Sequence, residues 1–515
     1  MRLAHSSIRR ILRGLRRHLL WTIFVSRISS IDVFAPSQQN DASGRIARGF
    51  FVRELLYIFF DLDIEFNERE SKPSELELNK KICEFATVDH MTMFGRALWR
   101  QCARQPYRGL HRFVYRKMMG EHAQFSAENI HHAFTAVASR VCLDPCVNIQ
   151  SFQFIAETVD YHLRVLIGVD PESGMLLTGT PSEPVVAEVA ATMLVRNNGA
   201  TSDMKAWGTC IRVLSEYLLA RGIVDKGIKG ELFGRLLCIL ARDQLPDGLS
   251  ADEDFRYSRP FKVDMFLNEL LGNGTVNRLI DAKLQGRPCR GNNEGTLPVW
   301  DEKSDFRQGW CNFNHFTFTT EKLPRNREMF QDVIRRLLKR NAALQLAPSQ
   351  TDWDLLLPVY TGDINRPIER DHLSAIFVQI KNRQKPVQLT LGTEYRDYFL
   401  PGQLGFCIQM EFGASWQNPS PHMRWPTLSR TTGDSTEILE PFVFGMQVFG
   451  ADERTFPFLA KYPSLTVVCG NLVRTLTTNG YCPEEEEAIR GMLPFAVRRP
   501  READGCGDGM DVGAS

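Results

Sequence analysis

The spacing of apolar residues changes along the chain. In the first half, FVRELLYIFFDL and HHAFTAVASRVC carry apolar residues three and four positions apart, which is typical of amphipathic helices. In the second half, DLLLPVY, AIFVQIK, LGFCIQMEFG and FVFGMQVFG are short apolar runs of the kind that form buried strands. The pattern predicts an α+β or α/β fold, with a mainly helical N-terminal lobe followed by an α/β region that contains a mixed sheet.

Breaks in this pattern divide the chain. The turn-rich stretch VDPESGMLLTGTPSEP suggests a boundary between two domains. We expect a basic segment at 1–43, a helical domain at 44–175, an α/β domain at 176–498 with a loop-rich insertion at 246–307, and a disordered tail at 499–515.

Four helices are expected in the middle of the chain. SEPVVAEVAATML has Ser182 as a candidate N-cap, and MKAWGTCIRVLSEYLLARGIV follows as a second helix. KGELFGRLLCILARDQ is opened by Gly230 and Glu231, and NREMFQDVIRRLLKRNA is an amphipathic helix just before the strand-like runs.

Composition and charge narrow the classes of function. The chain has 515 residues, is 43% hydrophobic and has a net charge of +1, as in an ordinary globular protein without a global field for polyanions. Nucleic-acid contact must then come from local patches such as RRLLKR (335–340), although a solvated helix face explains that run equally well. Twelve cysteines at irregular intervals fit buried thiols in a reducing, intracellular compartment.

The N-terminus is strongly basic. The first thirty residues contain seven arginines and no acidic residue, with Leu12, Leu15, Leu19 and Ile23 at helical spacing. Three interpretations stay open: a mitochondrial presequence, a phosphate-binding helix, or an amphipathic helix with a solvated face. No apolar run reaches the roughly 18 residues of a transmembrane helix. The expected location is therefore the nucleus or cytoplasm, with the mitochondrion as the alternative.

Two adjacent strand candidates carry potential catalytic residues. Gln379 and Lys381 end AIFVQIK, and residues two apart in a strand point to the same face. Asp354 begins the strand before, and antiparallel pairing across TGDINRPIERDHL would bring it close to both. Carboxylate and amide oxygens can bind Mg²⁺, while a nearby lysine can orient water and offset negative charge. Such a group suits phosphodiester hydrolysis.

The order of Asp354, a short connection and an apolar strand ending in Gln379-Ile380-Lys381 resembles the PD-(D/E)xK nuclease superfamily, also called restriction-endonuclease-like, in its Gln variant. The resemblance covers 230–413 and implies Mg²⁺ as cofactor, Asp354 and Gln379 as metal ligands, Lys381 as the catalytic lysine, and an acid from a helix. Glu231 is our choice for that acid and for a further metal ligand. Glu328 and Asp332 are the alternatives, which we expect to be solvated.

A fainter resemblance is to fungal Crinkler-like proteins, in which a nuclease-like region follows a P-loop module. The phosphate-binding motif GxxxxGK[ST] does not occur in this sequence. The [DEQ]xK pattern recurs at Asp203, Asp281 and Asp301, but only at Gln379 does it end an apolar strand that follows an acid-led strand. The specificity of the signal therefore comes from its context.

Two other pairs of potential ligands are expected to be structural. Cys142 and Cys146 lack a second pair with zinc-site spacing. His131 and His132 are neighbours on a predicted helix, where successive side chains diverge by about 100°. We expect neither pair to hold a metal.

The sequence thus predicts a Mg²⁺-dependent nucleic-acid phosphodiesterase that acts on DNA or RNA, with a helical lobe that contacts nucleic acid or an unidentified protein partner. The alternative is a non-catalytic interaction or nucleic-acid-binding protein that retains a decayed nuclease-like scaffold, because Gln379 brings no charge to the site. Convergence of Asp354, Gln379 and Lys381 in one pocket would favour the enzyme.

Overall fold

The structure is a computed structural model of the chain. It describes residues 48, 62–71, 79–104, 109–120, 124–145, 151–169, 176–195, 205–219, 229–245, 253–272, 309–347, 353–381, 398, 404–412, 423–424 and 442–461. The expected basic segment at 1–43 and the expected tail at 499–515 lie outside the described residues, as does the expected helical run FVRELLYIFFDL up to residue 61.

Helices make up the first half of the described chain and recur between the strands. The α-helices are α4 (Ile64–Ser71), α6 (Val88–Met91), α7 (Ala97–Ala103), α8 (Leu110–Met118), α9 (Ile130–Val141), α10 (Phe152–Tyr161), α11 (Pro184–Val195), α12 (Lys205–Val213), α13 (Lys229–Asp243), α14 (Val263–Leu271) and α16 (Arg327–Arg340). Shorter turns are the 3-10 helices η2 (Ile82–Ala86), η4 (Glu253–Ser258), η7 (Arg370–His372) and η8 (Pro457–Lys461), and the π-helix η3 (Leu214–Leu219).

The strands are β1 (Val165–Val169), β2 (Leu176–Gly179), β3 (Phe261–Lys262), β4 (Trp310–Cys311), β5 (His315–Phe318), β6 (Ala342–Gln345), β7 (Leu355–Tyr360), β8 (Leu373–Lys381), β9 (Leu404–Glu411), β10 (Met423–Arg424) and β11 (Phe442–Phe449). β1 and β2 form an antiparallel pair. The other strands form a nine-stranded sheet in the order β10-β11-β9-β8-β7-β4-β3, with β6 joining β5 to β7.

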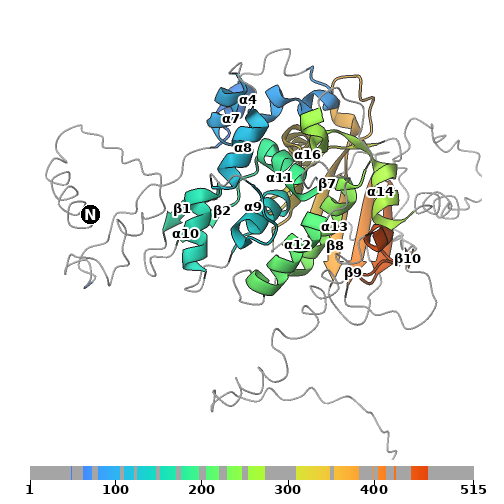
Figure 1. Cartoon of the computed structure of the whole chain (residues 1–515). Helices are drawn as coiled ribbons and strands as arrows, with labels where there is room; N and C mark the ends of the chain where they lie inside the picture. The colour runs from blue at the N-terminus through green and yellow to red at the C-terminus, as the bar shows by residue number, and fades with distance from the viewer. Residues whose placement is uncertain are drawn as a thin grey trace, which may run out of the picture. The chain divides into compact units, whose positions relative to one another are not determined.

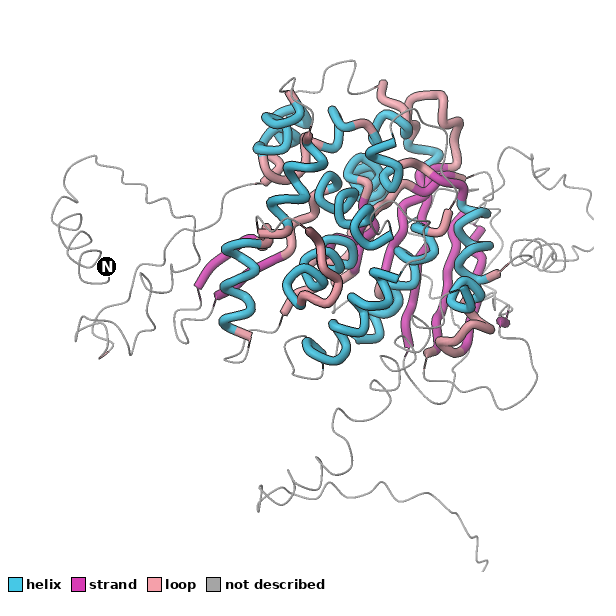
Figure 2. The backbone as a smooth tube through the Cα atoms, viewed as in Figure 1, coloured by secondary structure: helices cyan, strands magenta, loops and turns pink. Residues whose placement is uncertain are grey.

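This sheet is mixed, because β7 and β8 are antiparallel while β8, β9 and β11 run parallel to one another. Figure 2 shows the strands as a layer with helices in front of it. The predicted α+β class with a mixed sheet is confirmed, and the strand-like runs DLLLPVY and AIFVQIK are β7 and β8.

Apolar residues on β8 alternate between two cores, as the two-residue period of a strand requires. Ile376 and Val378 belong to the larger core, which also contains the apolar residues of α9, α13 and α14. Ala375 and Phe377 belong to a second core with α16. Helices therefore cover both faces of the sheet, with α9, α12 and α13 on the near side in Figure 1.

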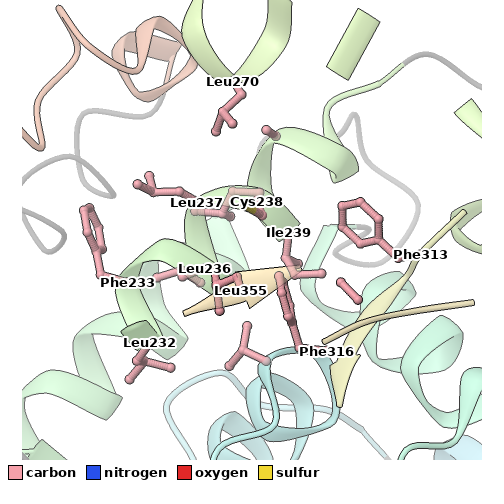
Figure 3. Close-up of a cluster of buried hydrophobic side chains, with 14 of the residues drawn as sticks. Leu232, Phe233, Leu236, Leu237, Cys238, Ile239, Leu270, Phe313, Phe316 and Leu355 are labelled. Carbon is pink, nitrogen blue, oxygen red and sulfur yellow. The ribbon is translucent and has the colours of Figure 1, made fainter. Parts of the chain in front are cut away.

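Helix α13 lies at the centre of the larger core. All its residues from Leu232 to Asp243 are buried, and in Figure 3 Leu236 lies next to Leu355 of β7. The core also includes Val137 of α9, so the helical segment before residue 175 and the sheet share one core. Burying so long a helix against β7 and β8 fixes where its N-terminal end meets the sheet.

Two expectations about loops need correction. The loop-rich insertion expected over 246–307 contains η4, β3 and α14, and α14 buries Phe266 and Leu270 in the larger core. The turn-rich stretch at 169–184 contains strand β2. In both places Gly, Asn, Asp and Pro on either side of a short element dominated the local composition and concealed its apolar spacing.

Candidate active site at the end of strand β8

Strand β8 extends beyond its neighbour β7 at one end. The pairing of the two strands stops at Leu355 and Val378, so the last residues of β8 have no partner on β7. Asp354 directly precedes β7, and its side chain supplies the partner that the β7 backbone does not provide. Its Oδ2 accepts a hydrogen bond of 2.5 Å from the backbone N–H of Ile380. An acid at this position therefore caps the extended strand end and is held in a fixed orientation.

Glu231 reaches the same strand end from the first turn of α13. The helix can approach β8 closely because residue 234 is glycine, and a Cβ there would overlap Cδ1 of Ile380. The Glu231 carboxylate is fixed by a residue on β6, since Nε2 of Gln345 donates a hydrogen bond of 2.6 Å to its Oε2. Glu231 of α13 and Asp354 therefore both lie at the end of β8, around Ile380.

Their charges interact. Burial raises the pKa of Glu231 above its usual value and the negative charge of Asp354 raises it further, whereas Arg235, the Gln345 amide and Lys381 act in the opposite direction. Burial also raises the pKa of Asp354, opposed by the Ile380 hydrogen bond and by the charge of Lys381. Glu231, Asp354 and Lys381 therefore form one electrostatic group at the strand end.

Each carboxylate has one oxygen held by the protein. Within the described residues, no donor bonds Oε1 of Glu231 or Oδ1 of Asp354, and the Lys381 ammonium makes neither a hydrogen bond nor an ion pair. The part of the chain that the structure describes has no group of three Asp, Glu, His or Cys able to hold a metal ion. Mg²⁺ commonly uses one or two protein carboxylates plus water and substrate phosphate, so two carboxylates with open oxygens fit it.

Gln379 is half-buried and, by strand alternation, shares a face with Lys381. Among the described residues its side chain forms no hydrogen bond with Asp354. The two-residue period places Gln379 on the face of Ala375 and Phe377, away from α13. It lies opposite Gln409 of β9, and Lys381 lies opposite Glu411. The buried Glu411 accepts hydrogen bonds from the side chains of Gln409 and Gln447.

This row of polar residues was not predicted from the sequence; it consists of Gln379 and Lys381 on β8, Gln409 and Glu411 on β9, and Gln447 on β11. Its signal is the alternation of polar and apolar residues in CIQMEF, which repeats that of VQIK. Gln345 was missed as well, because a single amide at a strand end resembles an exposed edge position.

The alternative helix acids lie elsewhere. Asp332 of α16 forms an ion pair of 3.0 Å with Arg370, the first residue of η7, the short turn that leads into β8. The start of β8 is about 26 Å from Lys381 at a rise of roughly 3.3 Å per residue. Glu328 is exposed at the start of α16. Glu231 is the helix acid on whose pKa the charges of Asp354 and Lys381 act.

A second polar constellation has the connectivity of a nucleophile and a base. Ser182 Oγ lies 2.7 Å from Nε2 of His315, whose Nδ1 lies 2.5 Å from Oδ1 of Asn314. Burial, reinforced by the charges of Arg340 and Arg140, lowers the pKa of His315 to about 3. A histidine with so low a pKa is a poor general base near neutral pH. The hydrogen bond between Ser182 and His315 instead connects the segment before α11 to β5. Ser182, expected as an N-cap, instead bonds His315.

The structure describes three of the four other ligand candidates. Burial raises the pKa of Cys142 to about 12, and Cys146 lies outside the described residues. Nε2 of His131 lies 2.9 Å from the Glu157 carboxylate, and burial lowers the pKa of His131. His132 accepts a hydrogen bond from the backbone of Ser126, and both histidine rings lie against His162.

Comparisons of the chain with protein-family models, with curated proteins and with solved structures gave no match. Across the residues that the structure describes, no helix combines the length and the apolar character needed to cross a membrane. The function is therefore argued from the geometry and chemistry of the site.

Proposed function

We propose that the chain is a Mg²⁺-dependent nucleic-acid phosphodiesterase. The observation that carries the proposal is the meeting of Glu231, Asp354 and Lys381 at one end of β8, with an open oxygen on each carboxylate. The order of elements supports it. The nuclease resemblance implies a helix with an acid, then strands that carry the Asp and the (D/E/Q)xK residues, then a further helix and strand. Helix α13 and strands β7, β8 and β9 follow this order, while the segment between β8 and β9, where the further helix would lie, is outside the described residues except for residue 398.

The residues divide into ligands and a cation. Glu231 and Asp354 would hold Mg²⁺ through their open oxygens. Gln379 lies on the face of β8 that is turned away from α13, so it would be a neutral auxiliary ligand on the side of Asp354 and Lys381. When bound, the metal ion supplies positive charge that stabilises the negative charge developing on the phosphate. Lys381, half-buried beside these groups, orients the attacking water and offsets negative charge in the transition state.

The raised pKa values of both carboxylates predict a pH dependence. Protonation removes the negative charge that attracts a cation, so metal binding should weaken as the pH falls through the pKa values of Glu231 and Asp354. Because these pKa values lie above the usual range for carboxyl groups, activity should decline at a higher pH than in a site with ordinary acids.

One observation favours the non-catalytic alternative. Gln379 occupies the position where the nuclease pattern usually has an acid, and an amide adds no charge to attract Mg²⁺. In addition, the hydrogen bond from Ile380 to Asp354 stabilises the end of β8 whether or not a metal binds. A protein that kept the scaffold alone would retain this bond.

The test is cleavage of single- and double-stranded DNA and RNA by purified protein with Mg²⁺, with Mn²⁺ and with a chelator. Lys381→Met keeps the length of the side chain and removes its charge. The matched control is Lys322→Met, at an exposed lysine between β5 and α16. We expect metal-dependent cleavage that falls by about 100-fold or more in Lys381→Met and is unchanged in Lys322→Met.

A second variant separates chemistry from folding. Asp354→Asn retains a side-chain oxygen for the Ile380 N–H and loses the charge, so it should fold and fail to cut. Absence of metal-dependent cleavage by the unmodified protein on the whole panel, or equal cleavage by the Lys381→Met protein, would favour the non-catalytic alternative.

A further inference from the structure

We propose that Gln345 is the positioning residue for Glu231: its amide holds one carboxylate oxygen so that the other is available beside Asp354. The consequence for cleavage rests on the proposed function. The coupling between Gln345 and Glu231 does not, and it can be measured without any activity.

Gln345 is placed where it can align both acids. It is the last residue of β6 and pairs with Leu355, the residue that follows Asp354. The next residue, Leu346, donates a backbone hydrogen bond of 2.8 Å to the carbonyl oxygen of Asp354. The last residue of β6 and the residue that follows it therefore hold the side chain of one acid and the main chain of the other.

The direction of the Gln345 side chain follows from the strand. Ala343, two residues earlier on the same face of β6, belongs to the core that contains α13, whereas Leu344 belongs to the core on the opposite face. Gln345 consequently points toward α13 and reaches Glu231 at 2.6 Å. This donor occupies Oε2, and in the described part of the chain it is the only donor to that carboxylate.

The electrostatic effect of the amide is specific. Charged groups act on Glu231 from three directions: Arg235 on α13 itself, Asp354 before β7 and Lys381 on β8. The hydrogen bond from Gln345 lowers the pKa of Glu231, against burial and Asp354, which raise it. Without the amide, the carboxyl group should bind a proton more readily and should lose its fixed orientation.

The first measurement is the urea midpoint of four proteins at pH 7: the unmodified protein, Gln345→Met, Glu231→Gln and the double variant. Gln345→Met removes the donor to Oε2 of a half-buried carboxylate, so it should lower the midpoint. In the Glu231→Gln background the same change removes a hydrogen bond between two neutral groups, so the loss should be smaller.

The matched control is Gln153→Met on α10. Gln153 donates the same kind of amide hydrogen bond, of 3.0 Å, to Glu157 on the exposed surface of that helix. Gln153→Met should change the urea midpoint by the same amount in the unmodified protein and in the Glu231→Gln protein. Should Gln345→Met fail to fold, Gln345→Glu replaces the donor by a second carboxyl group, and its loss of stability should likewise be smaller in the Glu231→Gln background.

The second measurement is Mn²⁺ binding by calorimetry at neutral pH. Loss of a residue that orients a metal ligand typically weakens binding by about 10–100-fold, and we expect that range for Gln345→Met. An equal loss of stability on Gln345→Met with and without the Glu231 carboxylate would overturn the positioning role. Absence of Mn²⁺ binding and of cleavage in the unmodified protein would overturn the proposed function, while the double-mutant cycle would still decide the coupling between Gln345 and Glu231.

Discussion

Helix α13 carries a carboxylate at each end, and the two have opposite surroundings. At the C-terminal end, Asp243 forms an ion pair of 2.5 Å with Arg140, and both side chains are completely buried. At the N-terminal end, Glu231 accepts an amide hydrogen bond and lies near another carboxylate, Asp354. Arg140 neutralises the charge of Asp243 directly, whereas the negative charge of Asp354 repels that of Glu231.

The helix dipole makes this contrast more informative. Negative charge is favoured at a helix N-terminus and disfavoured at a C-terminus, so Asp243 has the worse position and Glu231 the better one. The direct cationic partner nevertheless belongs to Asp243. A buried acid that the fold depends on is paired, while acids held close together without a direct cationic partner are typical of sites that act on a cation or a substrate.

The largest expected effect is at the paired end. Asp243→Asn removes the ion-pair partner of the buried Arg140 guanidinium and should lower the free energy of unfolding by about 3 kcal/mol. Glu231→Gln, a change of the same chemistry at the other end, should alter it by less than about 1 kcal/mol. Urea unfolding at pH 7 measures both. Equal losses would mean that the two acids serve the fold alike, and the contrast would disappear.

A smaller effect is expected where α13 crosses β8. Gly234→Ala adds a Cβ that overlaps Cδ1 of Ile380, so despite the better helix propensity of alanine we expect a loss of about 1 kcal/mol. Ile380→Val deletes Cδ1. In that background Gly234→Ala should instead stabilise the protein by up to about 1 kcal/mol.

The same pair of variants tests how Glu231 is placed. If the close approach of α13 to β8 positions this acid, Gly234→Ala alone should weaken Mn²⁺ binding, and adding Ile380→Val should restore it. A loss of stability that is identical in both backgrounds would show that the contact between Gly234 and Ile380 does not control the position of the helix.

The sequence predicts one part of this site well. Strands β7 and β8 could be read from their continuous apolar runs, and the short connection between them made antiparallel pairing the natural choice, which the structure shows. Asp354 and the end of β8 follow directly from that pairing. Local patterns suffice here because the residues involved lie within 30 positions of one another along the chain.

The other part depends on packing that local patterns do not contain. Glu231, Glu328 and Asp332 all lie in first or second turns of amphipathic helices, and only the crossing of α13 over Ile380 distinguishes them. Gln345 was missed for the same reason, since its role comes from facing α13. Helix α14 was missed because its apolar spacing spans only nine residues between loop-like stretches.

The smallest expected effect tests the unpaired acid through its pH dependence. The raised pKa of Glu231 means that its contribution to stability is most favourable below the unfolded glutamate pKa and is lost as the pH rises through the folded value. Glu231→Gln removes this loss, so the variant should gain stability relative to the unmodified protein between pH 4.5 and pH 7, by roughly 1 kcal/mol or less.

Urea unfolding at the two pH values gives the comparison, with Glu328→Gln as a control at an exposed acid in the first turn of another helix. The N-terminal dipole of α13 favours the charged form of Glu231 and works against the expected gain, so the measured difference is a lower limit on the effect of burial and of Asp354. A Glu231→Gln protein that instead loses stability between pH 4.5 and pH 7 would place Glu231 with Asp243, as an acid whose charge the fold requires. A gain would mean that the chain keeps Glu231 charged at the expense of its own stability, as expected of an acid retained to bind a cation.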